Sequence, residues 1–322
     1  MRVLVVKISS MGDVIHTLPA LTDAMYAMPE ICFDWAVEED FSQIPTWHPG
    51  VRQVIPVAIR RWKKNWFSLN VRQERFHFKQ RLQHEDYDII IDAQGLIKTA
   101  ILITRIARGE SHGLDYKSAR EPFASLFYHR KHRIGKQQHA VERVRKLFAE
   151  SLNYPFSRKF GNYSISNYFH FSYKKKPYLV FLHSASQSRK LWPEAHWKKL
   201  IYLINDIGYQ IRLPWKTKEE YFRSKRFAKE SPNMMEVLPP LTLEELAAQL
   251  KDAIAIVSVD TGLSHLAAAL DKPNLTLFGP TDSVLVGGYG RYQSVIQAKD
   301  KNMESITAEY VWKRLQIMLL KQ

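Results

Sequence analysis

Cysteine is nearly absent from this chain, since Cys32 is the only one among 322 residues. A single cysteine cannot form a disulfide within the chain, and zinc sites built from four thiolates are excluded. Because Cys32 lies in the apolar stretch 31–35, we expect it to be a buried, unreactive thiol.

Long apolar runs are missing as well. No stretch approaches the roughly 20 residues that span a bilayer. The N-terminal residues 1–8 are too few, and turn polar too soon, to form a signal peptide. We therefore expect a protein that is made and kept in the cytoplasm.

Several nucleotide-binding and hydrolase motifs do not occur. The chain has no Walker A loop, and no Gly-x-Gly-x-x-Gly follows the first predicted strand, which disfavours nucleoside triphosphatases and dinucleotide enzymes. The Gly-x-Ser-x-Gly motif of hydrolases is absent too. Asp86 and Asp88 form the Asp-x-Asp pattern of metal-dependent sugar transferases, but they precede their predicted strand, at the wrong end of a parallel sheet. We interpret that match as chance.

Positive charge is in clear excess. The chain has 47 Lys and Arg against 32 Asp and Glu, a formal net charge of +15. Such an excess indicates a polyanionic partner, and nucleic acid, an anionic membrane surface and a phosphorylated substrate all fit. Because no helix-turn-helix, zinc-finger or RRM signature is present, we do not expect nucleic-acid binding.

Basic residues gather at 60–64, at Arg120 and at 130–133. Runs of charge are usually solvated faces, and each of these alone fits that interpretation. Aromatic residues between them favour a surface that contacts anionic lipid. These aromatic residues are Trp62, Trp66, Phe123, Phe127 and Tyr128.

Short apolar runs alternate with helical periodicities along the chain, which implies βαβ units and a mainly parallel sheet. Strands are predicted at 3–6, 33–37, 54–57 and 89–91, then at 178–182, 209–213, 253–257 and 275–278. Helices are predicted at 14–25, where Pro19 should cause a kink, and at 96–106, 197–204, 218–229 and 243–250. Thr242 and Glu245 form a capping box that opens the last of these helices.

The pattern of elements starts twice, which predicts two doubly wound domains. We expect an N-terminal domain over 1–155, a connection over 156–176, a C-terminal domain over 177–302 and a helix over 303–322 that could pack back on the first domain. Ligands of open parallel sheets bind beyond the carboxyl ends of the strands. If two such domains face each other, the cleft between them is the expected active site.

The first candidate motif, 7–13, directly follows the first predicted strand. Gly12 permits a tight turn, and Asp13 lies at the start of the next helix. Asp13 is either an N-cap or a general base that accepts a proton from an attacking hydroxyl. Since a helix N-terminus stabilises the anion and weakens the base, such a base would act while the new bond forms.

Two further motifs follow strands of the second series. In 257–265 the amides around Thr261 and Gly262 could cradle a diphosphate at a helix N-terminus, although an ordinary cap and turn fit equally well. His265 is either packed in the core or a ligand contact. In 183–190, Ser186 offers a hydroxyl and Lys190 a mobile charge suited to phosphate, at the same sheet edge as Asp260.

These motifs, with the segments 9–20, 92–96, 138–143, 258–265 and 278–282, resemble the family-9 glycosyltransferases. The matching segments span nearly the whole chain in the same order. The resemblance implies an α/β GT-B fold with two facing Rossmann-like domains and a cleft between them. It also implies an inverting transfer of L-glycero-D-manno-heptose from ADP-L-glycero-β-D-manno-heptose to the Kdo of Kdo2-lipid A, without an obligatory metal or a cofactor.

The resemblance also implies residue roles, with Asp13 as the general base and Lys190 assisting the departure of ADP. Leu241 stands where the family pattern leads us to expect Met, a nearly isosteric exchange. The implied donor-binding residues are Ser186, Lys190, Glu220, Leu241, Asp260, Thr261, Gly262 and His265. The implied acceptor-binding residues are Arg60, Arg61, Lys63, Lys64, Arg120 and His139.

Physical chemistry agrees with this assignment. An inverting transfer needs one base and a stabilised leaving group, and helix amides with Lys190 would stabilise the charge that develops on ADP. The implied partners are ADP-heptose, Kdo2-lipid A and the anionic surface of the inner membrane on its cytoplasmic side. Two alternatives stay open: transfer of a second heptose with the same machinery, and non-catalytic binding of anionic lipid.

Overall fold

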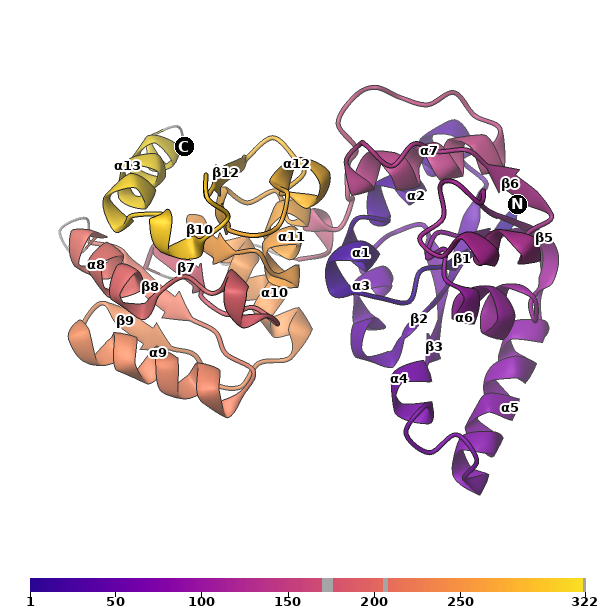
Figure 1. Cartoon of the computed structure of the whole chain (residues 1–322), viewed down its shortest axis with the longest axis horizontal. Helices are drawn as coiled ribbons and strands as arrows, with labels where there is room; N and C mark the ends of the chain where they lie inside the picture. The colour runs from indigo at the N-terminus through magenta and orange to yellow at the C-terminus, as the bar shows by residue number, and fades with distance from the viewer. Residues whose placement is uncertain (170–175, 205–207, 321–322) are drawn as a thin grey trace. The chain divides into compact units, whose positions relative to one another are not determined.

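The computed structural model describes residues 1–169, 176–204 and 208–320. It divides into two compact units, Met1–Ile165 and Ser166–Gln322 (Figure 1). Each unit has its own six-stranded parallel sheet with helices around it, so the predicted pair of α/β units is confirmed. Residues 170–175 of the predicted connection lie outside the described residues.

The N-terminal sheet has the strand order β3-β2-β1-β4-β5-β6. Its strands are β1 (Arg2–Val6), β2 (Cys32–Glu38), β3 (Val51–Val57), β4 (Asp86–Asp92), β5 (Arg108–Leu114) and β6 (Arg130–His132). Residues 3–6 of β1 are completely buried, as expected for a central strand of a sheet covered on both faces. The order reverses between β1 and β4, and ligands of doubly wound sheets bind at such a reversal.

The N-terminal helices differ in two places from the sequence-based expectation. Pro19 does not kink one long helix, because the chain forms two helices and Pro19 lies in the first turn of the second, where a missing amide costs no hydrogen bond. Residues 97–104 form one short α-helix that continues as a π-helix. The helices are α1 (Met11–Ile15), α2 (Leu18–Ala27), η1 (Glu39–Phe41), α3 (Gln43–Thr46), α4 (Ile59–Trp62), α5 (Leu69–Gln83), α6 (Ile97–Thr99), η2 (Ala100–Thr104), η3 (Pro122–Phe127) and α7 (Ala140–Leu152).

The C-terminal sheet repeats this topology, with the strand order β12-β11-β10-β7-β8-β9 and its reversal between β7 and β10. Its strands are β7 (Tyr178–Leu182), β8 (Gln210–Leu213), β9 (Met235–Val237), β10 (Ala255–Val259), β11 (Asn274–Phe278) and β12 (Gln293–Gln297). Strand β10 begins two residues later than predicted. The helices are η4 (Ser166–Tyr168), η5 (Ser188–Lys190), α8 (Glu194–Ile204), α9 (Lys218–Glu230), α10 (Leu243–Asp252), α11 (Gly262–Ala269), α12 (Ser283–Val286), η7 (Met303–Ser305) and α13 (Ala308–Leu319).

The final helix α13 belongs to the core of the C-terminal unit. It packs beside α8 (Figure 1), and its Val311 and Leu315 are completely buried in the cluster that also contains Trp197. The sequence had allowed a return of this helix to the first domain, whereas its apolar face is used within the second unit.

Two further observations bear on the sequence-based expectations. Cys32 is only half-buried at the start of β2, so the expected core thiol is wrong. Within residues 1–169, 176–204 and 208–320, no helix combines the length and the apolar character that crossing a bilayer requires.

Candidate active site

Asp13 lies in the first turn of α1, at the carboxyl end of the central strand β1. Its Oδ2 accepts hydrogen bonds from the Ser10 backbone amide at 2.8 Å and from the Ser10 hydroxyl at 3.0 Å. Ser10 is therefore the N-cap, and Asp13 is the third residue of the helix in a capping box. These contacts hold the carboxylate in one orientation.

A buried lysine sets the charge state of Asp13. Burial alone would raise the pKa of Asp13, but the Lys7 charge and the two Ser10 hydrogen bonds outweigh it and hold that pKa below its usual range. Lys7 is 8% exposed, and its Nζ donates to the Ala93 carbonyl at 2.8 Å. Burial lowers the pKa of Lys7, while the Asp13 and Asp92 charges act in the opposite direction. The pair places a base and a cation together at the sheet reversal.

The loop after β4 holds the loop after β1 in place. The side-chain oxygen of Gln94 accepts hydrogen bonds from the Ile8 and Ser9 amides, at 2.9 and 3.1 Å. Asp92, which is completely buried, in turn accepts bonds from the Gln94 and Gly95 amides. Its second oxygen accepts bonds from two threonine hydroxyls. Burial raises the pKa of Asp92, and these hydrogen bonds oppose that effect.

A small cavity of about 120 Å³ opens beside Asp13. Arg120, which the resemblance assigned to the acceptor, lines the same cavity as Asp13. His139 caps α7 with its ring nitrogen, and its ring lies edge-on to His16, with 5.6 Å between centroids. The side chains that line the cavity are those of Lys7, Asp13, His16, Ala93, Gln94, Leu114, Arg120, Ala140, Arg143, Val144 and Leu147.

The basic segment 60–64 lies elsewhere on the same edge of the sheet. It follows β3 and forms α4 with the turn after it, and it does not line the cavity beside Asp13. Arg61 is held by Glu39 at 3.0 Å and Glu74 at 2.9 Å. Lys63 and Lys64 are exposed.

In the C-terminal unit, Lys190 and Asp260 form an ion pair. Lys190 lies in the segment after β7, Asp260 directly follows β10, and these two strands are neighbours at the reversal of the second sheet. The Lys190 Nζ lies 2.6 Å from the Asp260 Oδ2, and Asp260 is 7% exposed. Thr261 is the N-cap of α11 and makes no side-chain cap, so the Gly262 end of that helix presents its backbone amides.

The remaining predicted donor residues lie on loops and helices that follow strands of this sheet. Ser186 is exposed in the loop after β7. Glu220 lies in the first turn of α9, where its Oε2 accepts hydrogen bonds from the Lys216 and Thr217 amides at 2.7 and 3.3 Å. Leu241 is half-buried before α10. His265 is buried inside α11.

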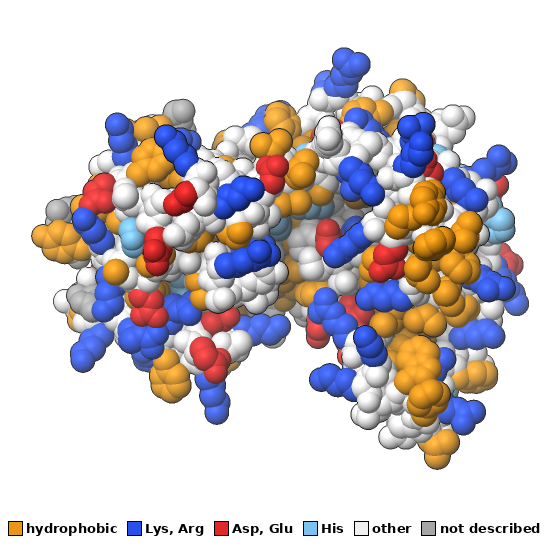
Figure 2. Space-filling model, in the orientation of Figure 1, with side chains coloured by type: hydrophobic (Ala, Val, Ile, Leu, Met, Phe, Trp, Pro, Cys, Tyr) orange, Lys and Arg blue, Asp and Glu red, His pale blue; other side chains and the backbone are white. Residues whose placement is uncertain are grey.

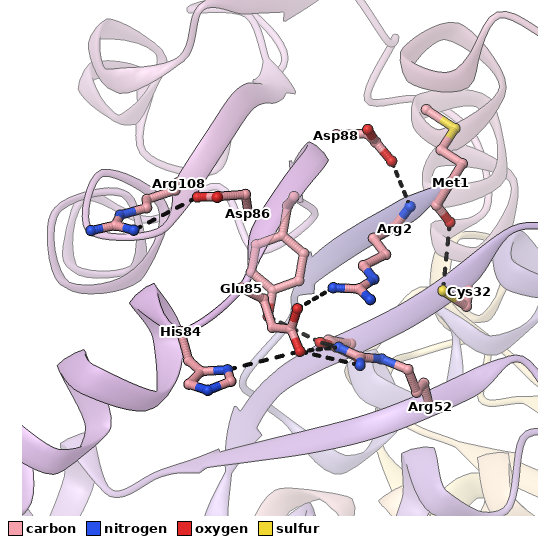
Figure 3. A network of polar contacts seen from close by, with 11 residues as sticks. Met1, Arg2, Cys32, Arg52, His84, Glu85, Asp86, Asp88 and Arg108 are labelled. Atoms are coloured by element: carbon pink, nitrogen blue, oxygen red, sulfur yellow. Dashed lines mark hydrogen bonds and ion pairs between the residues drawn. The ribbon is translucent and has the colours of Figure 1, made fainter.

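The Asp-x-Asp pattern proves to be structural, and it begins strand β4 rather than preceding it. Asp88 accepts a hydrogen bond from the Arg2 amide at 2.7 Å, and Asp86 lies 3.8 Å from Arg108 (Figure 3). Nearby, Glu85 bridges Arg2 and Arg52. This network lies at the amino ends of the strands, opposite Asp13. Among the described residues, no three His, Cys, Asp or Glu side chains gather so that they could hold a metal ion.

Sequence reasoning missed three residues of the site beside Asp13. Lys7, Gln94 and Arg143 line the cavity but had received no role. Each lies inside a motif that carried the family resemblance or begins one, so the signal was present. The expectation that aromatic residues form a lipid-contacting surface is wrong for Trp62 and Tyr128, because their exposed fractions are only 5% and 4%.

Comparison with known proteins places the chain in one family. Residues 75–315 match the model of glycosyltransferase family 9 (heptosyltransferase). The chain is 55% identical to lipopolysaccharide heptosyltransferase 1 of Escherichia coli K12, over 98% of this chain and 99% of that protein. It is 52% identical to the protein of the same name from Pseudomonas aeruginosa, over 91% of this chain and 82% of that one.

Solved structures agree. The structure of E. coli heptosyltransferase WaaC with ADP has a TM-score of 0.96 at 53% identity and covers 99% of this chain and 100% of its own. WaaC with ADP-2-deoxy-2-fluoro heptose has a TM-score of 0.93 and covers 98% and 99%. This chain therefore belongs to glycosyltransferase family 9, the heptosyltransferases.

Proposed function

We propose that the chain transfers L-glycero-D-manno-heptose from ADP-L-glycero-β-D-manno-heptose to the Kdo of Kdo2-lipid A, the first heptose transfer of the lipopolysaccharide inner core. The observation that carries this proposal is the similarity, over nearly the whole chain, to proteins named heptosyltransferase 1 and to a structure that holds an ADP-heptose analogue.

The proposed reaction inverts the anomeric carbon in one displacement. The Kdo hydroxyl oxygen forms the new bond to the heptose, its proton passes to the Asp13 carboxylate, and the bond to the ADP phosphate breaks. The low pKa of Asp13 makes it a weak base before the reaction. It becomes effective because the hydroxyl grows acidic as its oxygen bonds to carbon.

The leaving group needs positive charge where ADP departs. Lys190 and the backbone amides at the start of α11 supply it, and they lie at the reversal of the C-terminal sheet, where anionic ligands of this fold class bind. Asp260 would hold Lys190 until ADP-heptose binds and then share it between the phosphate and the heptose hydroxyls. Ser186, Glu220, Leu241 and His265 would complete the donor site.

The acceptor is an anionic lipid, and we propose that cations of the N-terminal unit bind it. Arg120 shares the cavity with Asp13, and His139 adjoins it through His16. Arg60, Arg61, Lys63 and Lys64 form the second group, at the other end of the same sheet edge. We also propose that the chain works at the anionic cytoplasmic surface of the inner membrane.

Transfer of the second heptose is less well supported. A relative named lipooligosaccharide heptosyltransferase 2, from Haemophilus influenzae, is 30% identical over only 29% of this chain. The E. coli heptosyltransferase II structure is 21% identical, so it supports the fold alone.

The experiment offers ADP-heptose with either Kdo2-lipid A or its monoheptosylated form to the purified chain and measures the release of ADP. The proposal expects turnover with Kdo2-lipid A. Turnover with only the monoheptosylated acceptor would assign the second transfer instead, and turnover with neither would refute heptose transfer to this core.

A further inference from the structure

A second cavity of the N-terminal unit lies apart from Asp13, where α5 meets α4 and η2. Its volume is about 260 Å³. Aromatic and aliphatic side chains make up most of its wall: Trp62, Trp66, Phe76, Phe78, Leu102 and Ile106. None of these residues has a role in the proposed transfer of heptose.

Three cations also lie at this cavity, and two of them are exposed. Arg72, Arg75 and Lys79 come from successive turns of α5 and complete its lining. The Arg75 guanidinium lies over the Trp66 ring, 3.6 Å from its centroid, where the ring can stabilise the charge. The one acid of this stretch, Glu74, is already used, because its oxygens accept hydrogen bonds from Arg61 and from the Trp62 indole. The cavity is therefore mainly apolar, and the charged side chains that line it are all positive.

Large exposed apolar side chains lie on α5 and just before it. Phe67, which precedes α5, is 89% exposed. Leu69, the first residue of α5, is 73% exposed, and Phe76 on the same helix is 58% exposed. Figure 2 shows hydrophobic side chains gathered over this face of the N-terminal unit, with Lys and Arg along the margins. Clustered, exposed large apolar side chains mark interaction sites in soluble proteins.

We propose that one surface of the N-terminal unit docks the chain on a bilayer that contains anionic phospholipid. This surface, the α5 face, consists of Phe67, Leu69, Arg72, Arg75, Phe76 and Lys79. Phe67, Leu69 and Phe76 enter the boundary between headgroups and acyl chains, and the cavity under Trp66 receives the end of one lipid chain. Arg72, Arg75 and Lys79 contact the lipid phosphates in the headgroup region. An aromatic and aliphatic centre with a cationic rim is the pattern of proteins that lie on a membrane.

This inference deepens the proposed membrane association and assigns it to one surface. It also places the bilayer next to the basic segment 60–64, because Trp62 of α4 is part of the cavity wall and Glu74 joins α4 to α5. A lipid acceptor in the same bilayer would then present its anionic headgroup to Arg61 and its neighbours.

The test measures partitioning onto vesicles of phosphatidylcholine, with and without phosphatidylglycerol, by co-sedimentation. The wild-type chain should bind the anionic vesicles and leave the neutral ones. Leu69→Ser with Phe76→Ser should weaken binding by about tenfold or more, since two large apolar groups leave the lipid. Arg72→Glu and Lys79→Glu should each weaken it by at least about fivefold.

A matched control is available on the other unit. Phe222 of α9 is 58% exposed, the same as Phe76, so Phe222→Ser removes an equal aromatic group from another surface. It should leave vesicle binding unchanged. Turnover with a water-soluble, deacylated acceptor should stay normal in Leu69→Ser/Phe76→Ser. If the wild-type chain itself does not turn over this acceptor, the result counts against the proposed function and not against the α5 face.

A second readout tests the depth of contact. Phosphatidylglycerol brominated on its acyl chains should quench part of the tryptophan emission of the wild-type chain. Trp66→Phe should reduce that part, and the remainder should come from Trp62, which also lines the cavity. The inference is overturned if the α5 variants bind vesicles like the wild-type chain, if neutral vesicles bind equally well, or if neither kind binds. It is also overturned if the variants affect only the preference for an acylated acceptor, which would make that acceptor the occupant of the cavity.

Discussion

Replacing Asp13 with asparagine removes one negative charge beside the cavity of about 120 Å³ and leaves the side-chain volume almost unchanged. The new amide oxygen can still accept the hydrogen bond of the Ser10 backbone amide, now 2.8 Å from Asp13. The loss of an anion in the first turn of a helix costs about 0.3–1 kcal/mol. Lys7 also loses one of the two carboxylates that oppose the effect of its burial. We expect the free energy of unfolding to fall by about 1–3 kcal/mol in total.

The effect on catalysis should be much larger. Without a proton acceptor at this position, kcat should fall by about 10²-fold or more, which corresponds to about 2.7 kcal/mol in the activation free energy. ADP affinity should stay within about twofold, because the proposed diphosphate contacts belong to the C-terminal unit. The assays are ADP release with saturating Kdo2-lipid A and calorimetric titration with ADP.

A control for the charge itself lies at the opposite edge of the same sheet. Asp86 has an 84% exposed side chain at the amino end of β4, and Asp86→Asn also removes one negative charge. It should leave kcat unchanged. If Asp13→Asn keeps kcat within about threefold of wild type while it still binds ADP, the reasoning about Asp13 is refuted.

The pH profile follows from the same contacts. Because Lys7 and Ser10 hold the pKa of Asp13 below its usual range, the base is ionised at neutral pH and loses activity only as the pH falls through that low pKa. Activity limited by Asp13 should therefore persist down to the ordinary aspartate pKa of about 3.9. Activity that instead falls near pH 6 would contradict this expectation. If replacing one histidine removes that fall and leaves the enzyme active, the proton transfer belongs to that histidine.

Three further predictions concern other buried polar groups. Lys190→Met leaves the buried Asp260 without the ammonium 2.6 Å away, so the free energy of unfolding should fall by roughly 2–4 kcal/mol. ADP should bind at least about tenfold more weakly by calorimetry. The double variant with Asp260→Asn should recover stability but not ADP affinity, and full recovery of both would refute the donor role of Lys190. Arg145→Met should cost about 3–5 kcal/mol in urea unfolding, because Arg145 is 1% exposed and pairs with Asp23 at 2.7 Å and Glu142 at 2.9 Å, and a loss under about 1 kcal/mol would contradict this. Burial lowers the pKa of His48 to about 4, so His48 is protonated in the unfolded chain before it is protonated in the folded one as the pH falls from about 6.5. The free energy of unfolding should therefore fall by up to roughly 3 kcal/mol by pH 4. In His48→Asn the urea midpoint should change less between pH 4 and 7.5, and an unchanged pH dependence would exclude His48 as its cause.

Local sequence patterns predicted the central strands well because burial on both faces leaves a continuous apolar run. Residues 3–6 and 178–182 are such runs, and both are completely or almost completely buried strands of the two sheets. The edge strand β6, by contrast, has the sequence Arg-Lys-His, a pattern that predicts a solvent-exposed, charged segment and no strand. Only its pairing with β5 makes it a strand, and pairing is a long-range property that periodicity does not report.

The candidate site shows the same division. Asp13, Lys190 and Asp260 were identified because each follows a strand in a recognisable motif. Gln94 was not, because its function is to accept two amides from a loop more than 80 residues earlier in the chain. Trp62 reads like an exposed aromatic residue among arginines, yet it is buried, because α5 folds over it and Glu74 binds its indole nitrogen.

The sequence by itself determined the alternation of strands and helices, the start of a second α/β series, and the residue types at the carboxyl end of each central strand. These properties depend on neighbours within one or two turns of the chain, so a linear pattern records them. The tertiary structure alone decided the strand order, which places the Asp13 loop beside the Gln94 loop and Lys190 beside Asp260. It also decided which aromatic residues are buried and which form the α5 face. Those outcomes depend on free energies of packing between segments distant in the chain, and no local window of sequence contains both partners.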